Sequence, residues 1–372
     1  MNSAAPIESR MQSHLDNLTK PKGSLGNLED YCIRLAAIQG KVPPRIDKKG
    51  IYVFAGDHGV VAEGVSLYPQ EVTYQMVLNF LSGGAAINSL AKSTGWELMA
   101  VDAGVAADFP GDLRADRGDL HADHGDLHAD HGEGPGDGPM VPLIRKKIRK
   151  GTRNFLKENA MTASELEQAL ASGRELADHA GRSGYQLVAI GDMGIGNTTT
   201  AAALLVASGF DLDAIVDRGT GIDDKALERK RRVVAESVAA RGPFAGPLEI
   251  LAALGGYDLA MMAGLILGLQ GKGIGCVLDG FPVGAAAYMA YSINPAVKDY
   301  LFAGHRSKVA GHGPVLAALG LEPIVDLRMR LGEGTGAVIG GYMIELGVRC
   351  SAEMASFSQA GVSESQDDEK NF

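Results

Sequence analysis

The 372-residue sequence has few cysteines, few aromatic residues and no run of about 18 apolar residues. Its cysteines, Cys32, Cys276 and Cys350, are far apart and odd in number, which excludes a disulfide framework and a CxxC metal knuckle. The lack of a long apolar run excludes a membrane-spanning helix, and Met1–Leu15 is too polar for a secretory signal peptide. We therefore expect a cytoplasmic protein without a membrane anchor.

Positive charge is also scarce. The chain has 35 Lys+Arg against 45 Asp+Glu, a net charge of −10, so we expect no nucleic-acid partner. No grouping of His, Cys and Asp has the spacing of a metal site, and we expect neither a metal ion nor another cofactor. Glycine is abundant instead, with 50 residues or about 13%, against about 7% on average, which indicates many tight turns.

The segment 109–140 differs in composition from the rest. Gly111–Arg117 reads GDLRADR, and Gly118–His124 and Gly125–His131 both read GDLHADH. Because so polar a segment cannot offset the entropy cost of ordering, we predict a disordered, solvent-facing loop. Alternatively, its four histidines could bind a divalent metal ion loosely: His121, His124, His128 and His131.

Elsewhere, short apolar runs alternate with helical stretches. The predicted strands are residues 51–54, 98–101, 187–190, 214–216, 276–278 and 300–303. The predicted helices are residues 71–80, 85–93, 199–207, 224–240, 259–269 and 285–291. This alternation is typical of an α/β fold in which a mostly parallel sheet carries helices on both faces.

Glycine and polar residues follow all six predicted strands. These segments read AGDH (55–58), DAG (102–104), GDMG (191–194), DRG (217–219), DG (279–280) and GHR (304–306). Ligands of open parallel sheets bind outside the carboxyl ends of the strands, where glycine lets the backbone approach them closely. Six such ends predict an active-site rim at one edge of the sheet.

Two glycine-rich loops are candidate phosphate sites. Residues 191–200, GDMGIGNTTT, open an alanine-rich helix whose N–H groups and hydroxyls can hold an anion. The motif is neither a P-loop nor a dinucleotide fingerprint, and a turn with a helix cap explains it equally well. The second loop, residues 218–221, reads RGTG and is followed by Lys230 in the next predicted helix.

Two further segments leave their interpretation open. In LGEGTG, residues 331–336, Glu333 is either an acid at a helix start or a catalytic carboxylate. In AGHRSKVAGHG, residues 303–313, the histidines are either satisfied turn residues or part of a binding loop.

Ten motifs, taken together and in order, carry a family resemblance. They are KPKGSLGNLE (20–29), AGDHGV (55–60), GGAAIN (83–88), VDAGV (101–105), GTRNF (151–155), GDMGIGNTTTAAAL (191–204), RGTGIDD (218–224), LDGFPVGAAA (278–287), GHRS (304–307) and LRMRLGEGTGA (327–337). The chain resembles the nicotinate-nucleotide–dimethylbenzimidazole phosphoribosyltransferases of cobalamin lower-ligand biosynthesis.

The resemblance implies a doubly wound sheet and a homodimer. It also implies a small helical domain formed by residues 1–45 and 334–361, and a Rossmann-like α/β domain formed by residues 46–333. The insertion 109–140 has no counterpart in the usual pattern, and we expect the polar tail 362–372 to fray.

The implied reaction converts nicotinate mononucleotide and 5,6-dimethylbenzimidazole to α-ribazole 5′-phosphate and nicotinate, with inversion at ribose C1. In this family pattern Glu333 is the general base, and Asp192 stands where the family usually has Glu as a second carboxylate. The residues implied for phosphate and ribose are Gly194, Gly196, Asn197, Thr198, Gly219, Thr220, Lys230 and Ser307. The residues implied for the base are Ser82, Met193 and Leu331. Two other functions stay open: a non-catalytic nucleotide-binding protein of the same fold, and metal handling by the histidine-rich repeats.

We predict that replacing residues 111–138 by a short Gly/Ser bridge leaves folding and turnover almost unchanged, because the insertion lies outside every motif and loop closure depends weakly on length. Soluble yield and steady-state rate measure this. A tenfold loss of rate would show that the insertion participates in the reaction.

Overall fold

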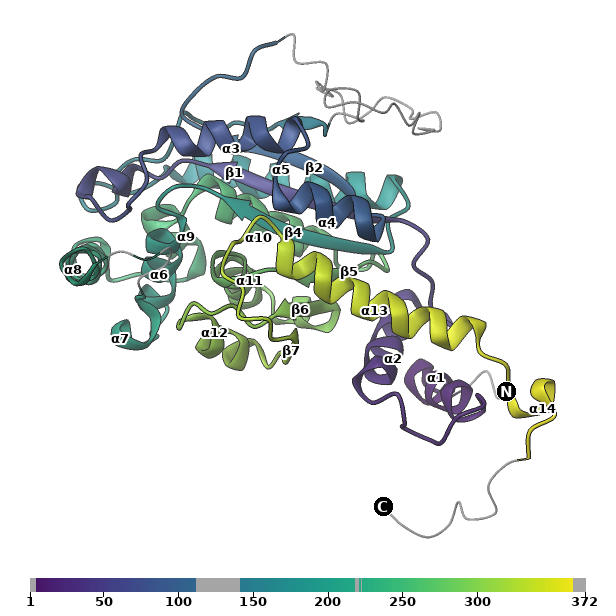
Figure 1. The fold of residues 1–372 in the computed structure, drawn as a ribbon. Coiled ribbons are helices and arrows are strands. Elements are labelled where there is room, and N and C mark those ends of the chain that lie inside the picture. Colours follow the sequence, from purple (N-terminus) through teal and green to yellow (C-terminus); the bar gives the residue numbers. More distant parts are fainter. Residues whose placement is uncertain (1–4, 112–140, 218–220, 222, 364–372) are drawn as a thin grey trace.

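The computed structural model describes residues 5–111, 141–217, 221 and 223–363 (Figure 1). The heptad insertion therefore lies outside the described residues, together with its four histidines. Gly219 and Thr220 also lie outside them.

Seven strands form one sheet in the order β3-β2-β1-β4-β5-β6-β7, and every neighbouring pair is parallel. The strands are β1 Lys49–Gly56, β2 Glu97–Gly104, β3 Leu143–Arg145, β4 Leu187–Met193, β5 Gly275–Leu278, β6 Leu301–His305 and β7 Pro323–Val325. The order reverses between β1 and β4, which makes the sheet doubly wound. The prediction of an α/β fold with a mostly parallel sheet is confirmed.

Both faces of the sheet are buried, which explains the continuous apolar runs of the sequence. Successive side chains of a strand point to opposite faces, so Tyr52 and Phe54 pack into one core cluster while Ile51 and Val53 pack into the other. All four are completely buried.

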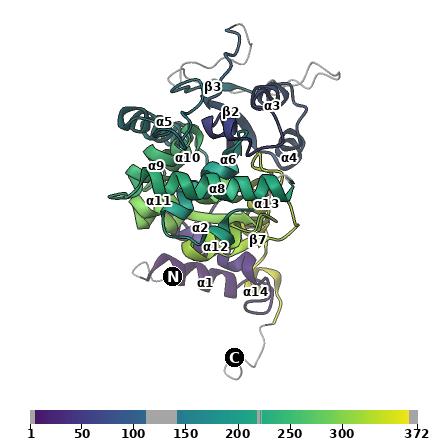
Figure 2. The same ribbon diagram turned by 90° about the vertical axis from the view of Figure 1, so that its left-hand side faces the viewer.

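Helices cover each face of the sheet (Figures 1 and 2). The first core cluster lies against α5 Ala163–Arg182, α6 Asn197–Ala207, α9 Pro247–Leu254, α10 Tyr257–Gly268, α11 Phe281–Ile293 and α12 His312–Leu319, with α8 Asp224–Arg241 packed on α6. The second lies against α1 Ile7–Asp16, α2 Asn27–Gln39, α3 Glu71–Leu81, α4 Ala86–Thr94 and α13 Thr335–Glu353. The shorter elements are η1 Gly59–Glu63, α7 Leu212–Ile215, η2 Pro295–Tyr300 and α14 Phe357–Ala360. None of the helices in the described ranges is long and apolar enough to cross a membrane.

The two ends of the chain meet on α13. This helix packs against α2 on one side and against α4 and the sheet on the other (Figure 1). A buried ion pair between Lys49 of β1 and Glu345 of α13 joins the helix to the sheet. Because α13 contacts both groups of elements, the division into a small helical domain and a larger α/β domain stays a prediction.

The structure departs from the sequence prediction at one strand. Residues 214–216 were expected to be extended, but Leu212–Ile215 forms the short helix α7. The Asp211 side chain accepts a hydrogen bond from the Ala214 N–H at 2.9 Å, which is the geometry of an N-cap. Three apolar residues are too few to distinguish a strand from one helical turn.

Several elements were not predicted, among them the strands β3 and β7 and the helices α5, α9 and α12. The strands β3 and β7 have only three residues each, too short to show a period. The long helix α5 does have a signal, because Thr162 and Glu165 form a capping box at its start.

Candidate active site

The carboxyl ends of β1 and β4 meet where the strand order reverses, which is where ligands of such sheets bind. Ionisable side chains gather at this edge and are buried: Asp57, His58, Asp192, Asp279, His305 and Glu333. The rim that the strand ends predict is therefore present at five of the six predicted ends. At the sixth, the helix α7 rather than a strand precedes Asp217, and residues 218 and 219 lie outside the described residues.

Glu333 lies in a strained loop between the sheet and α13. Gly332, Glu333 and Gly334 all have positive φ, of 86°, 61° and 85°. A non-glycine residue in this region costs free energy, and such strain concentrates at functional sites. The loop also packs closely on β4, since a Cβ at Gly191 would lie 2.6 Å from the Glu333 carbonyl carbon.

The Glu333 carboxylate is only partly satisfied. It accepts a hydrogen bond from the Ile87 N–H in the first turn of α4, where the helix dipole favours an anion. Its Oε2 has no hydrogen-bond partner among the described residues. Burial raises the pKa of this carboxyl above its usual value, against the opposing Ile87 hydrogen bond. A buried carboxylate with a free oxygen is a group that can take a proton from a bound ligand.

Asp279, at the end of β5, holds the loop in place. Its Oδ2 accepts from the Gly334 N–H at 3.0 Å, and its Oδ1 accepts from the Gly336 and Ala337 N–H groups at 2.8 and 3.2 Å. These donors belong to the start of α13, so Asp279 satisfies a helix terminus from a neighbouring strand. Sequence reasoning missed this role, although DG after a strand was noted as part of the rim.

Asp192, at the end of β4, is buried between two polar neighbours. Its Oδ2 accepts from Asn197 Nδ2 at 2.7 Å, and its carboxyl is also in hydrogen-bond contact with the carboxyl of Asp258 on α10. Burial, followed by the negative charge of Asp258, raises the pKa of Asp192 well above its usual value. Asp258 was not among the predicted site residues, because a lone Asp at a helix start resembles an ordinary capping acid.

The glycine loop Gly194–Gly196 connects β4 to α6. Gly196 has a φ of 93°, and a Cβ at Gly194 would lie 2.3 Å from the Gly56 carbonyl oxygen. The loop is fixed further by Thr73 of α3, whose Oγ1 accepts from the Ile195 N–H at 3.1 Å. The Asn197 Oδ1 accepts from the Thr198 N–H at 2.7 Å, at the start of α6.

Lys230 of α8 is almost fully buried and reaches α6. Its Nζ donates to Thr198 Oγ1 at 3.0 Å and to the Asp217 carbonyl at 3.1 Å. Burial lowers the pKa of this ammonium to about 8, so it is a cation poised to lose its proton near neutral pH. The structure thus brings two predicted phosphate residues, Lys230 and Thr198, together.

Ser307 lies in the loop after β6, across from Gly280. A Cβ at Gly280 would be 3.8 Å from Ser307 Oγ, and the Ser307 N–H donates to His312 Nδ1 at 3.0 Å. Burial, with the nearby charges of His305 and Arg306, lowers the pKa of His312 to about 3, so it is neutral and accepts this bond.

The three residues expected to contact the dimethylbenzimidazole differ in exposure. Met193 is half-buried at the end of β4, whereas Ser82 is exposed at the end of α3 and Leu331 is 56% exposed. Ser82 precedes the turn into α4, the helix whose Ile87 N–H contacts Glu333.

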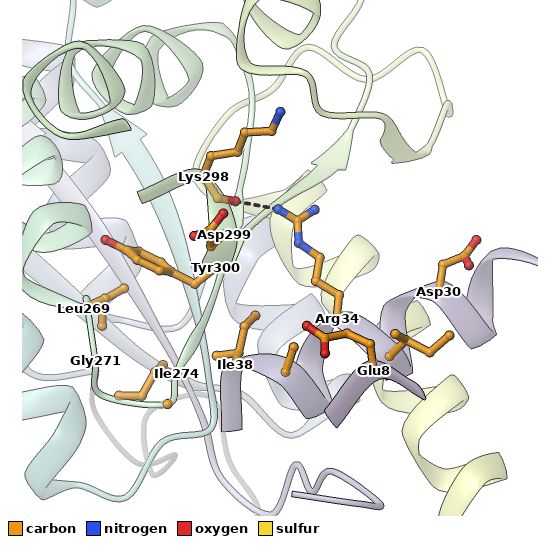
Figure 3. Close-up of a pocket in the computed structure, with 13 residues that line it drawn as sticks. Glu8, Asp30, Arg34, Ile38, Leu269, Gly271, Ile274, Lys298, Asp299 and Tyr300 are labelled. Carbon is orange, nitrogen blue, oxygen red and sulfur yellow. Dashed lines mark hydrogen bonds between the residues drawn. The ribbon is translucent and has the colours of Figure 1, made fainter. Parts of the chain in front are cut away.

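A cavity of about 630 Å³ lies elsewhere, between α1, α2 and the starts of β5 and β6 (Figure 3). Residues preceding these strands line it, including Ile274 and Tyr300, and Arg34 donates to the Lys298 carbonyl beside it. It is at the amino ends of the strands, opposite the candidate site.

The doubly wound parallel sheet and its glycine-lined rim of buried carboxyl groups define an α/β enzyme. A family model described as phosphoribosyltransferase matches residues 2–362. A nicotinate-nucleotide–dimethylbenzimidazole phosphoribosyltransferase of Geobacter sulfurreducens is 46% identical over 97% of this chain and 95% of that protein. A protein of the same name from Thermus thermophilus is 47% identical, and the match covers 94% of this chain and 96% of that protein. A crystal structure of CobT from Thermus thermophilus superposes with a TM-score of 0.85 at 45% identity, covering 97% of this chain and 100% of that one. The chain belongs to this family of phosphoribosyltransferases.

We predict that Asp192→Asn stabilises the protein at neutral pH. The pKa of Asp192 is raised by folding, so ionising this carboxyl costs stability as pH rises from the unfolded value of about 4 toward the folded value. An amide removes that cost and can donate to Asp258 while its oxygen still accepts from Asn197.

Thermal melts at pH 5 and pH 7.5 test this, with exposed Asp47→Asn as the control. Each kcal/mol gained corresponds to roughly 2–4 °C in a large domain. The gain in Tm should be larger at pH 7.5. A variant that melts lower than wild type at pH 7.5 would contradict the prediction.

Proposed function

We propose that this protein transfers the phosphoribosyl group of nicotinate mononucleotide to 5,6-dimethylbenzimidazole, giving α-ribazole 5′-phosphate and nicotinate for the cobalamin nucleotide loop. One observation carries the proposal: the buried Glu333 carboxylate, with an oxygen lacking a partner among the described residues, lies in a loop packed against β4 at the switch point of the sheet. The names of the relatives support the choice of substrates.

The reaction exchanges one bond at ribose C1. The bond from C1 to the pyridinium nitrogen breaks, and nicotinate leaves with the electron pair, which neutralises its ring nitrogen. One benzimidazole nitrogen forms the new bond on the opposite face, and the proton on the other nitrogen passes to Glu333. The positive charge of the leaving group assists its departure, and attack on the opposite face inverts the configuration.

Glu333 suits the role of general base because burial raises the pKa of its carboxyl. A stronger base takes up the benzimidazole proton more readily, and the carboxyl must be ionised to act. The rate should therefore rise with pH through this pKa.

The phosphate site we propose is formed by the glycine loop, Thr198 and Lys230, with Ser307 beside it. Its remaining members, Gly219 and Thr220, lie outside the described residues. The contact of Lys230 Nζ with Thr198 Oγ1 supports this assignment, because it directs a buried cation to the start of α6, where a helix dipole also favours an anion. We assign the base to the surface edged by Ser82, Met193 and Leu331.

We propose further that the enzyme is a homodimer in the cytoplasm, by analogy with the family pattern. A non-catalytic nucleotide-binding protein is the competing function. Incubation with nicotinate mononucleotide and 5,6-dimethylbenzimidazole separates the two, because only the enzyme releases nicotinate and forms a product with the mass of α-ribazole phosphate.

We predict that Glu333→Gln lowers turnover by roughly 10²–10⁴-fold, the usual contribution of a general base. The amide keeps the shape of the side chain, so the Michaelis constants should stay close to those of wild type. The rise of rate with pH should disappear. A variant that retains more than about a third of wild-type turnover would refute the assignment.

We predict that Lys230→Ala raises the Michaelis constant for nicotinate mononucleotide more than it lowers turnover, because a remote phosphate contact supplies binding common to ground and transition states. In wild type the same constant should rise above about pH 8, where the ammonium loses its proton. Lys230→Arg should remove that pH dependence. Lys225→Ala, an exposed lysine of the same helix, is the matched control. A change confined to the constant for the base would show that Lys230 does not bind the phosphate.

A further inference from the structure

His58 is a buried imidazole to which the proposed mechanism gives no role. It follows β1 and is completely buried, and both ring nitrogens have partners. Its Nε2 lies 3.0 Å from Asp258 Oδ2, and its Nδ1 lies 3.0 Å from Thr200 Oγ1 on α6. The Asp258 carboxyl of α10 and the Thr200 hydroxyl of α6 thus hold the two ring nitrogens.

The glycines of the site pack around this ring. A Cβ at Gly194 would lie 3.0 Å from His58 Nε2, and one at Gly256, just before α10, would lie 2.5 Å from His58 Cε1. At Gly196 a Cβ would lie 3.3 Å from the Cβ of His58. The imidazole therefore packs directly against the glycine loop Gly194–Gly196.

Asp258 connects His58 to Asp192. The two carboxyl groups interact directly, and Oδ1 of each has no other hydrogen-bond partner among the described residues. Two carboxyl groups can form a hydrogen bond only if one of them holds a proton. Asp57, which follows β1, and Asp279, which follows β5, add further acidic groups around the pair. The His58 contact fixes which oxygen of Asp258 remains for Asp192.

The chain of contacts continues to the phosphate site. Asp192 accepts from Asn197 at 2.7 Å, Asn197 accepts from the Thr198 N–H at 2.7 Å, and Thr198 accepts from Lys230 at 3.0 Å. Hydrogen bonds thus link Thr200 to Asp258 through His58, and link Asp192 to Lys230 through Asn197 and Thr198. The contact between the Asp258 and Asp192 carboxyl groups joins these two series. Every side chain along the chain is at least half-buried.

We propose that His58 is a positioning residue that orders the phosphate site through Asp258 and Asp192. Because its ring is fully buried and both ring nitrogens contact protein groups, it acts through Asp258 rather than on the substrate. It holds the Asp258 carboxyl, which holds Asp192, which in turn orients Asn197 and the first turn of α6. Asp192 accordingly acts on the start of α6 rather than on the dimethylbenzimidazole. This inference rests on the proposed function and specifies how its phosphate site is kept in shape.

The test measures both Michaelis constants and turnover for His58→Gln and Thr200→Val. Thr200→Val keeps the side-chain shape and removes the hydroxyl that contacts Nδ1. We expect His58→Gln to raise the constant for nicotinate mononucleotide about 10-fold, the effect of losing one hydrogen bond, with the constant for the base unchanged. Thr200→Val should raise the Michaelis constant for nicotinate mononucleotide about 3-fold, and Thr200→Ser should keep this constant at the wild-type value.

His179→Gln is the matched control, because His179 is a buried histidine whose Nδ1 lies 2.7 Å from the Tyr52 hydroxyl, outside this chain of contacts. It should lower Tm without changing either constant, which separates positioning from general destabilisation. If His58→Gln does not fold, Thr200→Val and its serine rescue decide the question.

Equal increases in both constants, or a folded Thr200→Val variant whose constant for nicotinate mononucleotide stays within twofold of wild type, would overturn the proposal. Wild-type enzyme that releases no nicotinate would instead overturn the proposed function. Calorimetric titration with nicotinate mononucleotide provides a readout independent of turnover, and His58→Gln should weaken its binding by the same factor.

Discussion

The burial of several carboxyl groups at one edge of the sheet is the constraint on which the rest of the site depends. A buried carboxylate is stable only if hydrogen-bond donors replace its lost hydration. Asp279 meets this condition by accepting from three N–H groups at the start of α13, and this contact sets the position of the loop that carries Glu333. The strain at Glu333 and the anchoring at Asp279 are thus parts of one arrangement, in which a helix terminus is bound to a strand end.

The two sides of the site are built differently. On the Glu333 side the carboxylate keeps an oxygen without a partner among the described residues, and burial raises its pKa. On the phosphate side the side chains from His58 to Lys230 are connected by a series of contacts. A free acceptor suits a group that must take up a proton, whereas a connected network suits a surface that must keep its shape. The stability lost by burying Asp192 beside Asp258 is consistent with this division, because functional sites commonly cost stability.

Much of the fold could be predicted because its signals are local. Apolar runs indicated β1, β2, β4, β5 and β6, and the alternation with helices indicated a parallel sheet. The failures also have local causes. Residues 214–216 form part of a helical turn capped by Asp211, and β3 and β7 are too short to show a period. The motifs around Glu333 and Asp192 identified the family, but nothing near them in the sequence pointed to Asp258.

The sequence by itself determined the class of fold, the order of its elements, the family and the candidate residues carried by glycine-rich motifs. Those features depend on patterns between residues that are near one another in the chain. Only the tertiary structure decided which polar groups meet. His58, Asp192 and Asp258 come from the ends of β1 and β4 and from α10, and Asp279 reaches the start of α13 from a distant part of the chain. The physical reason is that burial and hydrogen bonding act through space, so the pKa of Asp192 or Glu333 depends on neighbours that no sequence window contains.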